Sequence, residues 1–252
     1  MTMNIEALLS PAEYQARRAR GFVGEVCVVF DVLRATSVIV TGLANGAGGF
    51  VPAEEISEAV TLRAKYPGAL PAGEREGLKI TAAQSGGVEF DFGNSPREYT
   101  KSRVSEKIII STTTNGTRAL RACETADAVA VGSFLNLTAT VMWLQSRGAS
   151  RVVLVCAGTG ESAALEDILC AGAFCDLLAR SKQTCVVEDS AAAAWSVFRE
   201  AGNDLLGAMR HAQNGRRLLE NPELRDDVEF CLRRDVFEIV GLMGRDGMIR
   251  RV

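Results

Sequence analysis

The six residues DVLRAT, at positions 31–36, combine an acid, an arginine and a hydroxyl directly after the apolar run at 26–30. A carboxylate such as Asp31 in this place can bind Mg²⁺ or attack phosphorus as a nucleophile. Arg34 can hold a phosphate through two parallel hydrogen bonds, and Thr36 can begin a helix whose N–H groups face an anion. The same six residues would also fit a helix-capping turn with a surface ion pair.

The second polar stretch, STTTNGT at positions 111–117, follows the apolar run 108–110. Its five hydroxyl side chains and one amide offer many short hydrogen-bond donors without net charge, which suits an oxyanion. Its glycine also lets the backbone approach a ligand closely. A helix cap rich in hydroxyls is the structural alternative. The residues that we expect to bind substrate are Thr113, Thr114, Asn115, Gly116 and Thr117.

The third stretch, 157–162, follows the apolar run 152–156 and opens a helix that carries Glu166 and Asp167. It resembles half of a nucleotide-binding loop, but the Gly-Lys-Ser/Thr ending of a P-loop is missing, which argues against ATP. The two acids are candidate ligands for a metal ion. Because neighbouring residues point to different sides of a helix, we expect at most one of them to face a cleft directly.

Three further turns hold polar residues and give weaker signals. GER at 73–75 places an acid beside an arginine, whereas GNSP at 93–96 and GSFLN at 132–136 pair an amide with a hydroxyl. Each of these turns also has an ordinary structural interpretation. The candidate site residues that they add are Glu74, Arg75, Asn94, Ser95, Ser133 and Asn136.

The counts of residue types exclude several classes of site and partner. The single histidine, His211, lies late in the chain in a polar stretch, which argues against a Ser–His–Asp triad or a histidine-rich zinc site. The formal net charge is -3 and there is no long basic run, so we expect no nucleic acid as a partner. Any chemistry must therefore use carboxylates, hydroxyls, amides, arginines and a hard metal ion.

The chain also gives indications of its location. No apolar run approaches the roughly 20 residues that a membrane helix needs, and the N-terminal residues MTMNIE lack the layout of a signal peptide. The seven cysteines include no C-x-x-C pair, which is typical of thiols in a reducing compartment. We therefore expect a cytoplasmic protein that does not contact a membrane, and a homodimer is compatible with this picture.

The loops need a scaffold that brings them together. Each follows an apolar run and precedes a helical stretch, an alternation typical of an α/β fold with layered sheets and flanking helices. Ligands of such sheets bind at the carboxyl ends of the strands, so we expect the loops to converge. Residues 1–252 should form one compact unit, or two lobes divided near 100–105. Further helices are expected over 5–20, 54–65, 136–147, 189–201 and 222–233, and an irregular segment over 66–96.

Seven motifs in order are DVLRAT (31–36), ANGA (44–47), GER (73–75), GNSP (93–96), TTTNGT (112–117), GSFLN (132–136) and LEDILCAG (165–172). Together they resemble the 2-phosphosulfolactate phosphatase family. This resemblance implies an α/β fold with two related lobes around a shared central cleft. It also implies Mg²⁺-dependent hydrolysis of the phosphate ester of 2-phospho-3-sulfolactate, whose product, sulfolactate, leads toward coenzyme M. Residues 82–89 look like an insertion, which bears on the choice of substrate.

For such a substrate, a mechanism can be assigned to the candidate residues. We expect Mg²⁺ to bridge a phosphate oxygen and Asp31, together with Glu166 or Asp167. Arg34 and the loop 113–117 would hold the phosphate.

The other acid groups need partners as well. We expect Arg75 and Asn115 to hold the sulfonate or the carboxylate, and Glu74 to orient the attacking water. A covalent phosphate on Asp31 is the competing route.

Two other functions remain open. A phosphatase of the haloacid dehalogenase type would carry a second acid two residues after the nucleophile, where this chain has Leu33. A sensor for phosphorylated or sulfonated acids would bind its ligand without turnover and without metal dependence. Phosphate release measured with and without EDTA distinguishes such a sensor from either enzyme.

Overall fold

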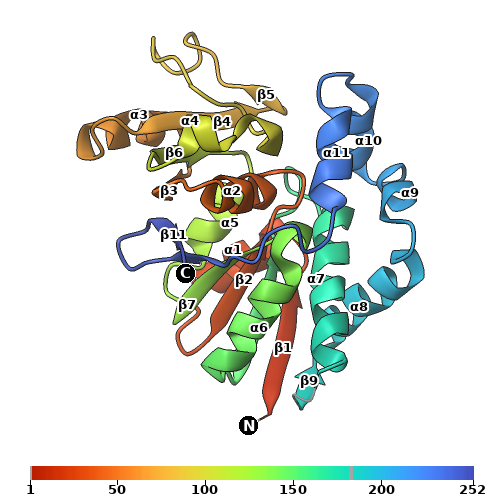
Figure 1. Cartoon of the computed structure of the whole chain (residues 1–252). Coiled ribbons are helices and arrows are strands. Elements are labelled where there is room, and N and C mark those ends of the chain that lie inside the picture. Colours follow the sequence, from red (N-terminus) through yellow and green to blue (C-terminus); the bar gives the residue numbers. More distant parts are fainter. Residues whose placement is uncertain (1, 182–183) are drawn as a thin grey trace.

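The structure, a computed structural model, describes residues 2–181 and 184–252 (Figure 1). Its strands are β1 (Met3–Leu8), β2 (Val26–Phe30), β3 (Gly49–Ala53), β4 (Leu70–Arg75), β5 (Leu78–Lys79), β6 (Ile108–Thr112), β7 (Ala128–Gly132), β8 (Arg151–Cys156), β9 (Cys185–Val187), β10 (Gly241–Met243) and β11 (Ile249–Arg251). They form one sheet in the order β5-β4-β6-β3-β11-β10-β7-β2-β8-β1-β9.

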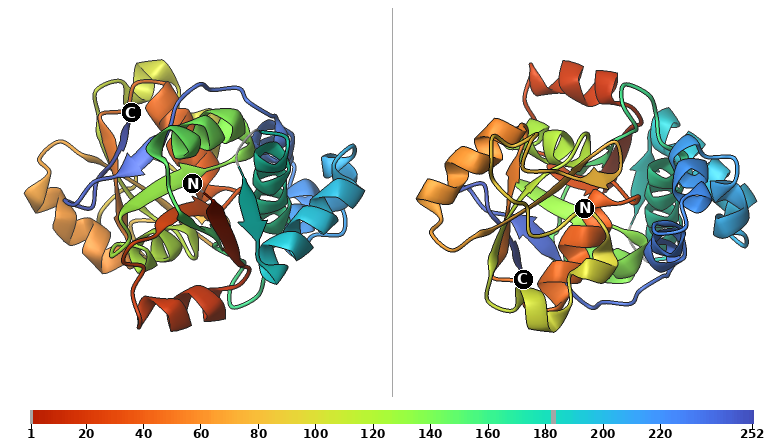
Figure 2. Two further views of the ribbon diagram at one scale, coloured as in Figure 1. Left: turned by 90° about the horizontal axis from the view of Figure 1, so that it is seen from below. Right: turned by 90° about the horizontal axis from the view of Figure 1, so that it is seen from above.

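Helices connect most of these strands and pack against the sheet. The α-helices are α1 (Pro11–Arg18), α2 (Ala35–Ala44), α3 (Ile56–Lys65), α4 (Lys101–Val104), α5 (Gly116–Ala122), α6 (Leu137–Arg147), α7 (Leu165–Ala179), α8 (Asp189–Ala201), α9 (Leu205–Met209), α10 (Gln213–Glu220) and α11 (Arg225–Leu232). Short 3₁₀ helices cover Pro96–Glu98 and Phe134–Asn136. Figure 2 shows α9–α11 at one side of the molecule and α3 at the other.

The sheet contains two groups of parallel strands. One group is β4-β6-β3 and the other is β7-β2-β8-β1-β9. The β10–β11 hairpin lies between them and pairs in the antiparallel sense with β3 on one side and β7 on the other. Because each antiparallel pairing reverses the strand direction, the two groups run in opposite senses along the sheet.

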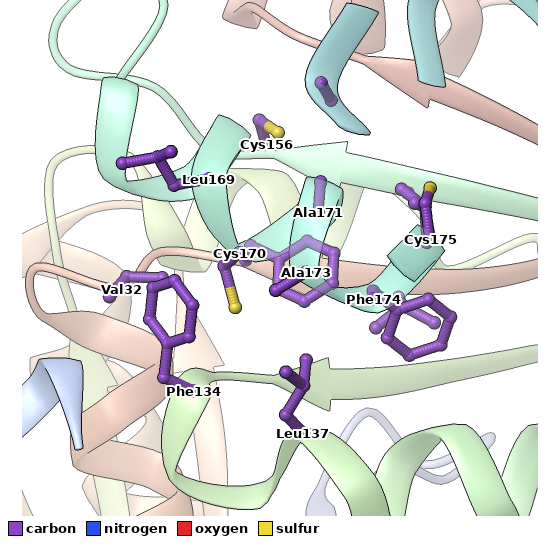
Figure 3. Close-up of a cluster of buried hydrophobic side chains, with 14 of the residues drawn as sticks. Val32, Phe134, Leu137, Cys156, Leu169, Cys170, Ala171, Ala173, Phe174 and Cys175 are labelled. Carbon is purple, nitrogen blue, oxygen red and sulfur yellow. The ribbon is translucent and has the colours of Figure 1, made fainter. Parts of the chain in front are cut away.

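Both faces of the central strands are buried, as their continuous Val and Ile runs predicted. In β2, Val28 and Phe30 pack into a cluster with α6, α7 and α8, whereas Cys27 and Val29 pack into a second cluster with α1, α2 and α5. Phe30 meets Phe174 of α7 edge-to-face, with ring centroids 6.1 Å apart. Figure 3 shows the first cluster, with α7 side chains facing Phe134 and Leu137. This packing fixes the ends of β2 and α7, where the site lies.

The prediction of a helix over 5–20 was wrong in its first part. Residues Met3–Leu8 form β1, and the helix α1 begins only at Pro11. Met3, Ile5 and Ala7 are buried while Asn4 is exposed, which is the alternation of a strand rather than of a helix. Tertiary pairing with β8 and β9 therefore decides the structure of this segment.

The prediction of an irregular segment over 66–96 was also wrong in part. It contains β4, which pairs in parallel with β6, and the short strand β5. Pro71 is compatible with β4 because its register with Ile110 is held by the neighbouring residues of the strand. Residues 82–89 form turns at the surface beyond β5.

The α/β class is confirmed, whereas the division into two lobes near 100–105 remains a prediction. No helix of the described residues is both long enough and apolar enough to span a bilayer.

Candidate active site

A cavity of about 260 Å³ lies where loops from both groups of parallel strands meet. The loops that follow β2, β4, β6 and β8 contribute to it, and so does helix α10. The lining residues are Asp31, Leu33, Arg34, Glu74, Glu76, Gly77, Asn94, Thr114, Asn115, Gly158, Thr159, Gly160, Gln213, Asn214 and Arg217. The expected convergence of the polar loops is therefore observed, although the two groups of strands run in opposite senses.

Asp31 occupies the centre of this arrangement at the end of β2. Its side chain is buried, and Oδ1 accepts a 3.0 Å hydrogen bond from the backbone N–H of Ala35 at the start of α2. No described residue donates a hydrogen bond to Oδ2. A Cβ placed on Gly116 would lie 2.5 Å from that oxygen, so only glycine lets the start of α5 come this close.

The acids around Asp31 make its negative charge unfavourable. The pKa of Asp31 is raised to about 7, mainly by burial and in part by the nearby charges of Glu74 and Glu166. Burial also raises the pKa of Asp167 well above its ordinary value, helped by the charges of Asp31 and Glu166. Buried carboxylates whose pKa values are raised by a charged neighbour are typical of functional sites.

Glu166 and Asp167 are neighbours on α7 but have different surroundings. Asp167 accepts backbone hydrogen bonds from Val32 at 2.8 Å and from Gly158 at 3.0 Å, so it joins two loops of the site. Glu166 accepts a 3.0 Å hydrogen bond from Asn214 through Oε1, whereas its buried Oε2 has no hydrogen-bond partner among the described residues. Neither acid lines the cavity itself.

The donor set fits a magnesium ion bound by two carboxylates. Within residues 2–181 and 184–252, no group of three or more His, Cys, Asp and Glu side chains is arranged to hold a metal. Magnesium needs only one or two carboxylates, because it keeps several waters. Of the buried carboxylates near Asp31, only Asp31 Oδ2 and Glu166 Oε2 accept no hydrogen bond from a described residue, and these two oxygens would hold such an ion.

Arg34 lines the cavity, but its charge is already engaged. Nη1 donates a 2.7 Å hydrogen bond to Asp227 of α11, and Nη2 donates one of 2.7 Å to the carbonyl of Gly77. Asp227 also accepts hydrogen bonds from Ser95 and Arg97, each at 2.7 Å. Ser95 thus belongs to this buried ion-pair network and does not line the cavity.

Glu74 and Arg75 point to different places. Glu74 lines the cavity, where Oε1 accepts from the backbone and hydroxyl of Thr114 and Oε2 accepts from Gly77 N at 2.7 Å. Arg75 lies outside the lining, and its guanidinium donates to the Glu74 carbonyl and to Thr112 Oγ1. The turn after β4 therefore presents its acid to the cavity rather than its base.

Comparison with known proteins agrees with these motifs. The family model for 2-phosphosulpholactate phosphatase matches residues 10–245. The chain belongs to this family. It is 41% identical to a probable 2-phosphosulfolactate phosphatase of Thermotoga petrophila, over 84% of this chain and 86% of the relative. It is 37% identical to a probable 2-phosphosulfolactate phosphatase of Caldicellulosiruptor saccharolyticus, again over 84% of this chain and 86% of the relative.

A third relative extends the match over more of the chain. The probable 2-phosphosulfolactate phosphatase of Clostridium acetobutylicum is 34% identical over 94% of this chain and 96% of its own length. The expected family is thereby confirmed, and with it the enzyme class, a phosphatase.

The family motif TTTNGT divides into residues that reach the cavity and residues that shape the loop. Thr114 and Asn115 line the cavity. Asn115 Nδ2 donates to the carbonyls of Ala157 and Gly160, and its Oδ1 accepts from Gly160 N, so Asn115 holds the loop after β8. Thr113 and Thr117 exchange hydrogen bonds at the start of α5. Thr113 and Thr117 position the loop without lining the cavity, and so does Gly116.

Three other candidates act on the backbone in the same way. Thr36 Oγ1 donates to the Asp31 carbonyl at 2.9 Å and accepts from Asp31 N at 3.0 Å, which fixes the backbone of DVLRAT. Ser133 and Asn136 form a capping box at the 3₁₀ helix after β7, and both are fully buried. They lie outside the cavity lining, whereas Asn94 belongs to it.

Sequence reasoning missed the contribution of α10. Gln213, Asn214 and Arg217 line the cavity from a helix far along the chain from DVLRAT, and Asn214 contacts Leu33 across 181 positions. The spacing of Asn214 and Arg217, three residues apart on a polar helix, is the only local signal that the two share a face. Glu76 and the glycines of the loop after β8 were missed as well.

Proposed function

We propose that this phosphatase hydrolyses 2-phospho-3-sulfolactate to 3-sulfolactate and phosphate in a magnesium-dependent reaction. The observation that carries the proposal is the cavity around Asp31, whose lining includes residues of DVLRAT, GER, GNSP and TTTNGT, four of the motifs that resemble the family. The names of the relatives point to the same substrate. In a host that makes coenzyme M, the product would enter that pathway.

The charge of the cavity supports a need for a cation. Three carboxylates line it, those of Asp31, Glu74 and Glu76, against the two guanidiniums of Arg34 and Arg217. A substrate with a phosphate and two further acid groups would bring about four negative charges into this surrounding. A bound Mg²⁺ would neutralise the charge that develops on the phosphoryl oxygens. Asp31 and Glu166 are the residues that would hold it.

The remaining residues bind and orient the reactants. Asn94 offers its side-chain amide to the phosphate from the cavity wall, whereas the hydroxyl of Thr114 is donated to Glu74. Glu74, fixed by Thr114 and Gly77, orients a water for attack on phosphorus and takes its proton. As the new P–O bond forms, the bond to the ester oxygen breaks, and that oxygen leaves with a proton from solvent. In the competing route the Asp31 carboxylate attacks first, and water then hydrolyses the aspartyl phosphate.

Phosphate release from 2-phospho-3-sulfolactate tests the proposal. We expect turnover with Mg²⁺, loss of turnover in EDTA and its recovery when Mg²⁺ is returned. Asp31→Asn should abolish turnover by either route, while Asp91→Asn, an exposed acid outside the cavity, should not change it. Binding of the substrate without phosphate release would favour a sensor and end the proposal, and so would normal turnover by a folded Asp31→Asn protein.

Cytoplasmic location and a homodimer remain predictions.

Leu33 lines the cavity at the position where a haloacid-dehalogenase-type enzyme would carry its second acid. That position offers no proton donor or acceptor, so this alternative has no support in the site.

A further inference from the structure

Two guanidinium groups reach the same side of the cavity. A Cβ built on Gly77 would lie 3.7 Å from Nη2 of Arg217 and 4.0 Å from Nη2 of Arg34. Both residues line the cavity, although one comes from the loop after β2 and the other from α10. A ligand in the cavity therefore meets two arginines, whose availability to an anion must be compared.

Arg34 is not available as a free cation. It is nearly fully buried, and its charge is paired at 2.7 Å with the fully buried carboxylate of Asp227. Its second terminal nitrogen donates to the Gly77 carbonyl. A new anion would have to share a guanidinium that the protein has already neutralised.

Arg217 has the opposite surroundings. Its side chain is exposed at the cavity, and its hydrogen bond is to a neutral group, Asn214 Oδ1, at 2.6 Å. No carboxylate lies within ion-pair distance of Arg217 among the described residues. It is thus the cavity arginine that forms no ion pair with a described residue.

Asn214 fixes Arg217 relative to the reacting centre. Its Nδ2 donates to the Leu33 carbonyl, next to Arg34 in DVLRAT, and to Glu166 Oε1 at 3.0 Å. Its Oδ1 receives the hydrogen bond from Arg217. Because Asn214 is buried and held from both sides, the position of the guanidinium is tied to the loop that carries Asp31.

We propose that Arg217 determines specificity by binding an acid group of the substrate other than the phosphate. This inference rests on the proposed function for its choice of substrate. A guanidinium presents paired N–H groups that match the oxygens of either a carboxylate or a sulfonate. Arg75, which the sequence suggested for this role, lies outside the cavity lining.

The test compares three phosphate esters that differ only in their other acid groups. They are 2-phospho-3-sulfolactate, 2-phospholactate, which lacks the sulfonate, and the phosphate ester of 2-hydroxypropane-1-sulfonate, which lacks the carboxylate. With Arg217→Gln we expect kcat/KM for the complete substrate to fall about 10- to 100-fold, the usual effect of losing a charged hydrogen bond. For one of the two shorter esters, kcat/KM should be the same with Arg217→Gln as with the wild type. The acid group that this ester lacks is the one that Arg217 binds.

Matched variants control for indirect effects. Arg216→Gln removes a neighbouring exposed arginine of α10 that does not line the cavity, and should leave all three esters unaffected. Arg217→Lys keeps the charge and should recover part of the loss. An equal loss for all three esters would mean that Arg217 binds the phosphate or only supports the fold, and either result overturns the inference, as does no loss at all.

Binding of 3-sulfolactate separates this inference from the proposed function. Calorimetry should show binding to the wild type and a Kd about 10-fold or more higher for Arg217→Gln. If none of the three esters is hydrolysed but this binding depends on Arg217, the proposed function fails and the inference stands. If the wild type does not bind 3-sulfolactate, or if Arg217→Gln binds it with the same Kd as the wild type, the inference fails.

Discussion

Nη1 of Arg34 donates a 2.7 Å hydrogen bond to Oδ2 of Asp227, which joins the loop after β2 to helix α11 across 193 positions of sequence. The side chains of both residues are almost completely shielded from solvent, at 3% and 0% exposure. Helix α11 is therefore held against the candidate active site by a buried ion pair. This pair gives the last part of the chain a structural role in the site.

Removal of Asp227 should destabilise the whole protein. Asp227→Ala leaves the Arg34 charge buried without its partner, which costs about 3–5 kcal/mol of unfolding free energy. Asp227→Asn keeps one acceptor oxygen and should cost less. Urea denaturation measures both, and Asp226→Ala, whose partner Arg97 pairs with it at the surface, is the control. A stability of Asp227→Ala equal to that of Asp226→Ala would contradict the structural role of the pair.

The raised pKa of Asp31 predicts an unusual dependence of the free energy of unfolding on pH. Its pKa is about 7 in the folded protein against an ordinary value of 3.8. Between these values the folded state binds a proton that the unfolded state has released, so the free energy of unfolding falls as pH rises from 4 to 7. Asp31→Asn removes this loss. In EDTA, the variant should exceed the wild type in stability above pH 7, by at most about 4 kcal/mol.

Urea denaturation at several pH values checks this sign. The difference between Asp31→Asn and wild type should shrink as pH falls toward 4, because Asp31 stays protonated in the folded state and becomes increasingly protonated in the unfolded state as pH nears 3.8. A constant difference over the whole range would show that Asp31 does not titrate with a raised pKa.

Glu166 and Asp167 should respond differently to the loss of charge. Glu166→Gln keeps the hydrogen bond from Asn214 through its amide oxygen, and removes an Oε2 that has no partner. We expect it to stay folded and to bind Mg²⁺ about 10-fold more weakly or worse. Each oxygen of Asp167 accepts a hydrogen bond from one backbone N–H group. Asp167→Asn replaces one of these oxygens by an NH₂ group, which cannot accept, and should lower the free energy of unfolding by about 1–3 kcal/mol.

The Mg²⁺-induced rise in melting temperature distinguishes these two effects. At a given Mg²⁺ concentration it should be smaller or absent in Glu166→Gln, whereas Asp167→Asn should show a lower melting temperature without Mg²⁺. Wild-type Mg²⁺ affinity in Glu166→Gln would remove Glu166 from the metal site.

Glu74→Gln tests the orientation of the water. An amide cannot accept the proton of the attacking water, so kcat should fall about 10²- to 10⁴-fold. The exposed Glu89→Gln, outside the cavity, serves as the control. Steady-state kinetics with saturating substrate gives the comparison, and a kcat near that of wild type would assign proton transfer to another group.

Some features of the site could be predicted because they are local. Asp31 follows a run of apolar residues that can only be a buried strand, and Thr114 and Asn115 follow another, so their place at strand ends was readable. The direction of each side chain was not. Thr36 and Ser133 have the residue types of ligand-binding groups, yet their hydroxyls bond to backbone groups and to other side chains of the protein.

The amino-acid sequence by itself determined the strand–loop–helix units, the α/β class and the family, because apolar runs and glycine-containing turns act over a few neighbouring residues. Only the tertiary structure decided which side chains share the cavity. Glu74 faces it and Arg75 does not, since successive residues of a strand point to opposite faces. Asn214 and Arg217 reach it because α10 folds back onto the first loop, a contact between residues 181 positions apart that no local pattern encodes.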